Sequence, residues 1–186
     1  MTVGIIAIQG AFLEHAHTLE KLGIKTLWVK EPADLKHIDR CIIPGGESTA
    51  ISKQMCESGL MQALKKRIEE GMPTMGTCAG LVLMAKSVDK DPLITLGVMD
   101  IQVKRNAYGR QLGSFSTRAS LPLISQNQVE LIFIRAPYIQ KVEPSVQIIH
   151  VHESRIVAVL QNRMFAVAFH PELTEQTCFH EYFLTI

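Results

Sequence analysis

A cysteine framed by two glycines, Gly76-Thr77-Cys78-Ala79-Gly80, follows a short apolar run at residues 73–75. Glycine on both sides permits the cramped strand-to-helix turn of a nucleophile elbow, whose serine version is G-x-S-x-G. A cysteine at such a turn lies at a helix N-terminus, where the helix dipole favours the thiolate. We therefore expect Cys78 to be a nucleophile that attacks a carbonyl carbon.

A thiol attacks only as the thiolate, so Cys78 needs a base, and His170-Pro171-Glu172 supplies a candidate. His170 follows a predicted strand at residues 165–169, and Pro171 restricts the chain beyond it. Glu172 is close enough in sequence to bond the far ring nitrogen, which would fix the tautomer and stabilise the imidazolium. Cys78, His170 and Glu172 together have the composition of a nucleophile–base–orienter triad.

The reaction also needs donors for an oxyanion. The backbone N–H of Ala79, directly after the nucleophile, is one donor expected by analogy with other elbows. The loop that contains Gly45 and Gly46 should supply the second, because glycine lets a backbone amide approach closely or flip.

These residues belong to a pattern of alternating strands and helices. Strands are predicted at residues 3–8, 26–29, 41–43 and 73–75, and helices at 12–22, 50–56 and 60–70. Ser48 or Thr49 would cap the second helix. Beyond about residue 93 the pattern favours strands at 99–104, 128–134, 147–151, 156–160 and 165–169, with a hairpin between the last two. Thr174 would cap a closing helix that ends near residue 184.

This order indicates an α/β fold in which a parallel sheet carries its site at the carboxyl ends of the strands. A length of 186 residues suits one domain, residues 1–186. A net charge of +1, with 20% charged residues, indicates neither nucleic-acid nor membrane-surface binding. No stretch is apolar enough to span a membrane.

The other cysteines (Cys41, Cys56 and Cys178) form no C-x-x-C pair, so we interpret them as packing residues in a reduced, cytoplasmic setting. His150 and His152 are too weak a pair to indicate a metal site, and we expect neither metal nor cofactor.

The motifs together resemble a family. The chain is similar to class I (triad) glutamine amidotransferases and, more narrowly, to the glutaminase subunits of two-component pyridoxal 5′-phosphate synthases. The resemblance rests on these segments: Ile6-Ala7-Ile8-Gln9-Gly10, Pro44-Gly45-Gly46-Glu47-Ser48-Thr49, Gly76-Thr77-Cys78-Ala79-Gly80, Arg105-Asn106-Ala107-Tyr108-Gly109-Arg110-Gln111, Phe133-Ile134-Arg135-Ala136-Pro137 and His170-Pro171-Glu172-Leu173. They span nearly the whole chain.

The resemblance implies a three-layer, flavodoxin-like sandwich with a mostly parallel central sheet flanked by helices. It implies hydrolysis of L-glutamine to glutamate and ammonia through a thioester, with the ammonia passing to a synthase subunit in a hetero-oligomer that makes pyridoxal phosphate (vitamin B6). It also implies that glutamine contacts Gly46, Glu47, Ser48, Arg105, Ile134 and Arg135. A guanidinium independently suits the α-carboxylate of glutamine. His15 would line the surface that meets the partner.

Two alternatives remain open at this stage. The chain could be a glutaminase that feeds another acceptor, such as one in the imidazole glycerol phosphate pathway. The P-G-G-E-S-T loop and the segment at residues 105–111 argue against that assignment. Alternatively, the chain could be a non-catalytic binding or regulatory protein on the same scaffold. A site without catalytic activity, however, would not need all three triad residues.

Overall fold

A computed structural model describes residues 1–105 and 113–186. The described residues form a ten-stranded mixed sheet and a separate two-stranded ribbon. One half of the large sheet is parallel and runs in the order β2 (Lys25–Val29), β1 (Thr2–Ile6), β3 (Arg40–Ile43), β4 (Thr74–Thr77) and β12 (Met164–Val167). β4 and β12 are buried along their whole length, as expected for parallel strands that are covered on both faces.

The other half of the sheet is largely antiparallel. It continues from β12 through β11 (Arg155–Gln161), β9 (Tyr138–Val142), β6 (Met99–Lys104) and β5 (Ala85–Val88), and β10 (Gln147–His152) pairs with β11. The ribbon consists of β7 (Ser114–Ala119) and β8 (Val129–Ile134). β6 and β8 alternate between buried and partly exposed residues, which is typical of strands with one covered face.

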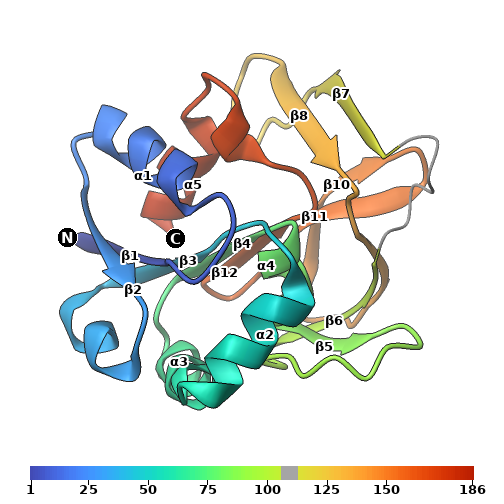
Figure 1. Ribbon diagram of the computed structural model, residues 1–186. Helices are drawn as coiled ribbons and strands as arrows, with labels where there is room; N and C mark the ends of the chain where they lie inside the picture. Colours follow the sequence, from blue (N-terminus) through green and yellow to red (C-terminus); the bar gives the residue numbers. More distant parts are fainter. Residues whose placement is uncertain (106–112) are drawn as a thin grey trace.

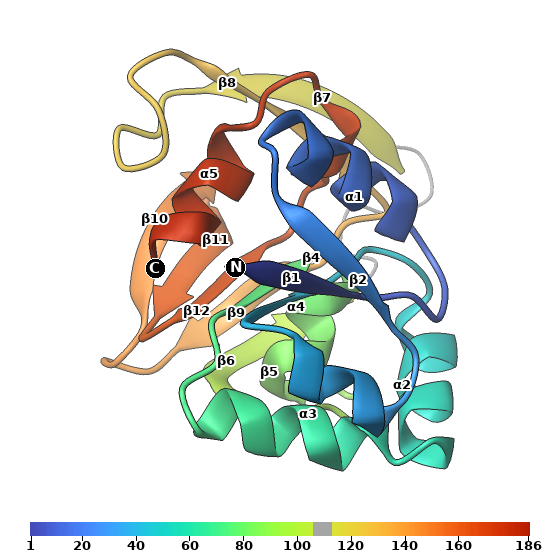
Figure 2. The same ribbon diagram turned by 90° about the vertical axis from the view of Figure 1, so that its left-hand side faces the viewer.

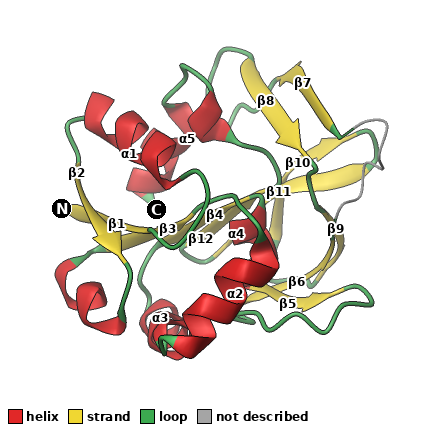
Figure 3. Cartoon of the chain, viewed as in Figure 1, coloured by secondary structure: helices red, strands yellow, loops and turns green. Residues whose placement is uncertain are grey.

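Helices cover both faces of the parallel half, which gives the three layers expected (Figures 1 and 2). α1 (Phe12–Lys21) and α5 (Cys178–Thr185) pack on one face, and the apolar cluster there includes Leu19, Phe179 and Phe183. The other face carries α2 (Ser48–Glu57), α3 (Leu60–Glu69) and α4 (Ala79–Met84). Two 3₁₀ turns, η1 (Pro32–His37) and η2 (Pro171–Leu173), complete the described elements. Figure 3 shows the parallel strands β1, β3, β4 and β12 between the two helical layers, whereas the β7–β8 ribbon lies to one side of them.

Two predicted helix caps are wrong. Glu47, rather than Ser48 or Thr49, caps α2: its carboxylate accepts hydrogen bonds from the backbone N–H groups of Thr49 and Ala50. Thr177, rather than Thr174, precedes α5, because Thr174 ends the 3₁₀ turn that follows His170. The start of α2 is therefore set by the Glu47 side chain, and the start of α5 is set by the 3₁₀ turn that precedes it.

The predicted hairpin between β11 and β12 is confirmed by the antiparallel pairing of Gln161 with Met164. Three strands, β5, β7 and β9, were not anticipated. β7 is exposed or only partly buried throughout, so its sequence lacks the apolar alternation that predicts a strand. No helix in the described part of the chain is long and apolar enough to cross a membrane.

Candidate active site

Cys78 occupies a strained turn between β4, which ends at Thr77, and α4, which begins at Ala79. Its φ of 48° and ψ of −101° lie in a region that non-glycine residues rarely adopt and that recurs at functional sites. The flanking glycines are required sterically. A Cβ on Gly76 would lie 2.7 Å from the backbone carbon of Gly80, and one on Gly80 would lie 1.9 Å from the carbonyl oxygen of Ile43. The structure therefore contains the elbow that the sequence predicts.

His170 and Glu172 lie beside this turn. β12 ends at Val167, two residues earlier than expected, and the 3₁₀ turn after His170 brings Glu172 back against the imidazole. His170 Nδ1 is 2.7 Å from Glu172 Oε1, and both residues are buried. Burial lowers the pKa of His170, but hydrogen bonds with Cys78 and Glu172 outweigh it and raise the pKa to about 10. A raised pKa favours the imidazolium, the form that pairs with a thiolate.

The Gly45–Gly46 loop closes over the imidazole. A Cβ on Gly45 would lie 2.4 Å from Cε1 of His170, so a side chain at this position would overlap the ring. The Gly45 N–H donates to Thr77 Oγ1 (3.1 Å), and the Gly45 carbonyl accepts from the Ala11 N–H (3.0 Å). Because the peptide group is planar and trans, the Gly46 N–H points away from Ala11. Of the two glycine N–H groups expected as oxyanion donors, that of Gly45 is already hydrogen-bonded to the Thr77 hydroxyl.

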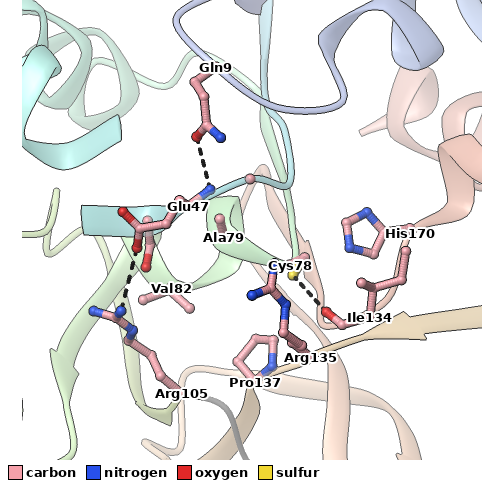
Figure 4. A pocket seen from close by; sticks show the side chains of 12 residues that line it. Gln9, Glu47, Cys78, Ala79, Val82, Arg105, Ile134, Arg135, Pro137 and His170 are labelled. Carbon is pink, nitrogen blue, oxygen red and sulfur yellow. Dashed lines mark hydrogen bonds and ion pairs between the residues drawn. The ribbon is translucent and has the colours of Figure 1, made fainter. Parts of the chain in front are cut away.

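The cysteine and the imidazole open into a cavity of about 290 Å³ (Figure 4). All six residues that the family resemblance assigns to substrate contact line it: Gly46, Glu47, Ser48, Arg105, Ile134 and Arg135. Cys78, Ala79 and His170 line it as well, whereas Glu172 lies buried behind the imidazole. The Cys78 sulfur is 3.9 Å from the carbonyl oxygen of Ile134.

Charged groups line one side of this cavity. The Arg105 guanidinium contacts Asp91 at 3.0 Å, Thr49 Oγ1 at 3.2 Å and Glu47 at 3.6 Å. Hydrogen bonds from the N–H groups of Thr49 and Ala50 lower the pKa of Glu47, so its carboxylate stays ionised. The cavity thus offers an anion and a guanidinium to a polar ligand.

Arg135 is held at a left-handed turn, with a φ of 43°, and its N–H donates to the Gly113 carbonyl. This turn places Arg135 on the wall of the cavity (Figure 4). Most of the arginine-rich motif that begins at Arg105 (Asn106-Ala107-Tyr108-Gly109-Arg110-Gln111) lies outside the described residues.

Sequence reasoning did not assign Gln9, Val82 or Pro137 to the site, yet they line the cavity. Gln9 Oε1 accepts the Glu47 N–H at 2.9 Å and so joins the first strand's turn to the glycine loop (Figure 4). The position of Gln9 after a buried parallel strand could have indicated that it belongs to the site, because the carboxyl ends of parallel strands gather at one edge of the sheet. Among residues 1–105 and 113–186, no group of three or more His, Cys, Asp or Glu side chains could hold a metal ion.

Comparison with known proteins places this geometry in a family. The model of the SNO glutamine amidotransferase family matches residues 5–186. The chain belongs to this family. It is 47% identical to the pyridoxal 5′-phosphate synthase subunit PdxT of Carboxydothermus hydrogenoformans, over 99% of this chain and 96% of that protein. It is also 47% identical to the subunit of the same name from a Thermoanaerobacter species, over 100% of this chain and 99% of that protein.

Solved structures confirm the fold class. A crystal structure of a glutamine amidotransferase superposes with a TM-score of 0.93 at 38% identity, and covers 98% of this chain and 97% of that one. The structure of PurLQS from Thermotoga maritima, at 14% identity, superposes with a TM-score of 0.68 over 99% of this chain and 97% of the matched chain. At that identity the likeness shows the fold alone.

Proposed function

We propose that this chain is the glutaminase subunit of a two-component pyridoxal 5′-phosphate synthase. It hydrolyses L-glutamine to glutamate and ammonia, and the ammonia passes to a synthase subunit in a hetero-oligomer. Family membership and the name that the two relatives share support the assignment. The observation that carries it is the convergence of Cys78, His170 and Glu172 beside a cavity lined by two arginines.

The first half of the reaction forms a thioester. The Cys78 thiolate attacks the amide carbon of glutamine, and the carbonyl electron pair moves onto oxygen to give a tetrahedral oxyanion. When the carbon–nitrogen bond breaks, the His170 imidazolium gives its proton to the departing nitrogen, which leaves as ammonia. The high pKa of His170 means that this proton is in place before the reaction begins. Glu172 holds the ring and stabilises its positive charge.

The second half hydrolyses the thioester. The now neutral His170 takes a proton from water as the water oxygen attacks the acyl carbon, and collapse releases glutamate. The thiolate and the imidazolium are thereby restored. The Ala79 N–H and the Gly46 N–H are the proposed oxyanion donors in both halves. Loss of one such donor costs about 3 kcal/mol of transition-state stabilisation.

The charges of the cavity suit the amino-acid end of glutamine. The guanidinium groups of Arg105 and Arg135 would take the α-carboxylate, since arginine binds carboxylates in a two-pronged geometry. The ionised Glu47 would attract the α-ammonium group. Ser48 and the backbone at Ile134 would complete the contacts. This arrangement leaves the side-chain amide to face Cys78.

We further infer that residues 1–186 act as a single domain in a reducing, cytoplasmic setting. All four cysteines are unpaired, which agrees with that setting. We expect the isolated chain to be a weak glutaminase that its partner activates, because an unpartnered enzyme would release ammonia wastefully. The Gly45–Gly46 peptide is the element whose reorientation the partner would control.

The test is glutamate release, measured with and without the cognate synthase subunit, for the wild type and for Cys78→Ala. The proposal expects stimulation of the wild type by that synthase and no activity in Cys78→Ala. Stimulation by an imidazole glycerol phosphate synthase instead would reassign the acceptor. Intact-mass analysis after treatment with a glutamine-mimicking electrophile separates catalysis from simple binding. Absence of a mass shift, even with the partner present, would favour a non-catalytic binding protein.

A further inference from the structure

Two histidines lie buried behind the proposed triad, and the reaction described above uses neither. His15 comes from α1 and His180 from α5, and both are fully shielded from solvent. His15 Nδ1 is 2.8 Å from His180 Nε2. The expectation that His15 lines a partner surface is therefore wrong: at 0% exposure it can contact no partner.

The other ring nitrogen of His15 faces two groups that belong to the site. Its Nε2 lies 3.1 Å from Thr77 Oγ1 and 3.5 Å from Glu172 Oε2. Glu172 orients His170 through its other oxygen, and Thr77 Oγ1 accepts the Gly45 N–H. The His15 ring thus lies between the orienting carboxylate and the loop of the oxyanion donors.

The hydrogen-bond network favours one tautomer of His15. Burial, then the nearby His180 and His170, lower the pKa of His15 well below its ordinary value, so the ring is neutral and carries one proton. With the proton on Nδ1, a lone pair on Nε2 would face the Glu172 carboxylate, and a His180 Nδ1–H would be buried without a partner. With the proton on Nε2, His15 donates towards Thr77 and Glu172 and accepts from His180. The second arrangement avoids both penalties.

We propose that His15 is a positioning residue for the glutaminase reaction: its Nε2–H donates to the Thr77 hydroxyl and faces the outer oxygen of Glu172 at 3.5 Å, an electrostatic contact that fixes the orientation of the carboxylate. This inference rests on the proposed function. Within the described residues Glu172 Oε2 makes no hydrogen bond, and the side chain is fully buried. Without the imidazole, the carboxylate would lose the N–H that faces its outer oxygen. A buried carboxylate that loses a facing N–H is no longer fixed in place and turns away from the imidazole.

The central variant is His15→Leu, with His15→Gln as the conservative variant because a glutamine amide nitrogen can reach the position of Nε2. His17→Leu is the matched control, since His17 lies in the same helix but is exposed. With the synthase subunit present, we expect His15→Leu to lower kcat at least tenfold with little change in KM, because His15 does not line the cavity. His15→Gln should recover most of the loss, and His17→Leu should match the wild type.

A double-mutant cycle separates positioning from a general loss of stability. The readout is the rate at which a glutamine-mimicking electrophile labels Cys78, which stays measurable in impaired variants. If His15 acts through Glu172, the His15→Leu penalty should shrink to about twofold or less in a Glu172→Ala background. An equal penalty in both backgrounds, or equal kcat for His15→Leu and wild type, overturns the proposal.

A further measurement does not depend on glutaminase activity. Alkylation of Cys78 by iodoacetamide is followed against pH by mass spectrometry of its peptide, because the exposed Cys56 also reacts. A displaced Glu172 stabilises the imidazolium less, so the pH midpoint of alkylation should rise in His15→Leu and return towards the wild type in His15→Gln. An unchanged midpoint in His15→Leu overturns the proposal even where glutamine proves not to be the substrate. Failure of the wild type to release glutamate would instead count against the proposed function.

Discussion

The contact between Gly45 and His170 gives a direct test of the proposed active site. An alanine Cβ at position 45 would lie 2.4 Å from Cε1 and 2.9 Å from Nδ1 of His170, whereas ordinary contact begins at 3.4 Å. The ring must therefore retreat by about 1 Å (3.4 − 2.4) to accept the methyl group. The same methyl group would just touch Cys78 Cβ, at 3.4 Å. Gly45→Ala should thus displace the base and leave the nucleophile in place.

A misplacement of about 1 Å can lower an enzymatic rate about 100-fold. That loss corresponds to about 2.7 kcal/mol of transition-state stabilisation. We expect kcat for glutamate release, measured with the synthase subunit, to fall by this factor in Gly45→Ala. Labelling of Cys78 by a glutamine-mimicking electrophile should slow in parallel, because the imidazole no longer supports the thiolate.

Gly23→Ala is the control for a general effect of replacing glycine. Gly23 follows α1 with a φ of +68°, and no atom lies within 4 Å of its added Cβ. Alanine in that left-handed conformation costs about 1 kcal/mol. Gly23→Ala should therefore lower Tm but leave kcat unchanged. Wild-type kcat in a folded Gly45→Ala would refute the argument that this close approach positions the base.

Three further predictions follow from the elbow and the triad. Glu172→Gln should retain the fold but lower kcat by up to about 10⁴-fold, because the amide favours the wrong imidazole tautomer; wild-type-like kcat would remove Glu172 from the triad. Gly80→Ala should destabilise the fold by about 3 kcal/mol, since its Cβ would meet the Ile43 carbonyl oxygen at 1.9 Å; denaturant unfolding measures this, and an unchanged midpoint would contradict it. The pKa of His170 is raised from 6.5 to about 10 in the folded chain, so the stability from its proton is complete below pH 6.5 and disappears as pH rises through 10. The Tm advantage of wild type over His170→Gln should shrink across that range, and parallel curves would be inconsistent with a raised pKa.

Much of the site could be predicted because its chemistry is carried by short local motifs. The glycines around Cys78 indicate a turn that only small neighbours permit, because a side chain at Gly76 or Gly80 would overlap the surrounding backbone. His170 and Glu172 are two residues apart, so a single turn suffices to join them. The substrate-contact residues came from the family resemblance rather than from periodicity, and all of them line the cavity. Their catalytic and binding roles remain predictions.

Other features of the fold and the site could not be predicted from the local sequence. The caps of α2 and α5 were misplaced by one to three residues, because Glu47 takes the backbone donors at the start of α2 and because Thr174 ends the 3₁₀ turn after His170. β7 and β9 have no strong apolar alternation, and they are strands because a partner strand satisfies their backbone groups. Gln9 joined the cavity only because β1 and β3 are adjacent in the sheet.

Residue types and their local order were enough to predict the reactive cysteine, its strained turn, the pairing of His170 with Glu172, and the parallel α/β order that gathers strand ends at one edge. These are properties of residue type and short spacing. Packing of distant segments was needed to show that Gly45 presses against His170, that the Gly45 N–H donates to Thr77, and that His15 is buried against Glu172. Each of these contacts joins residues far apart in the chain, and burial there depends on how α1, α5 and the sheet pack together.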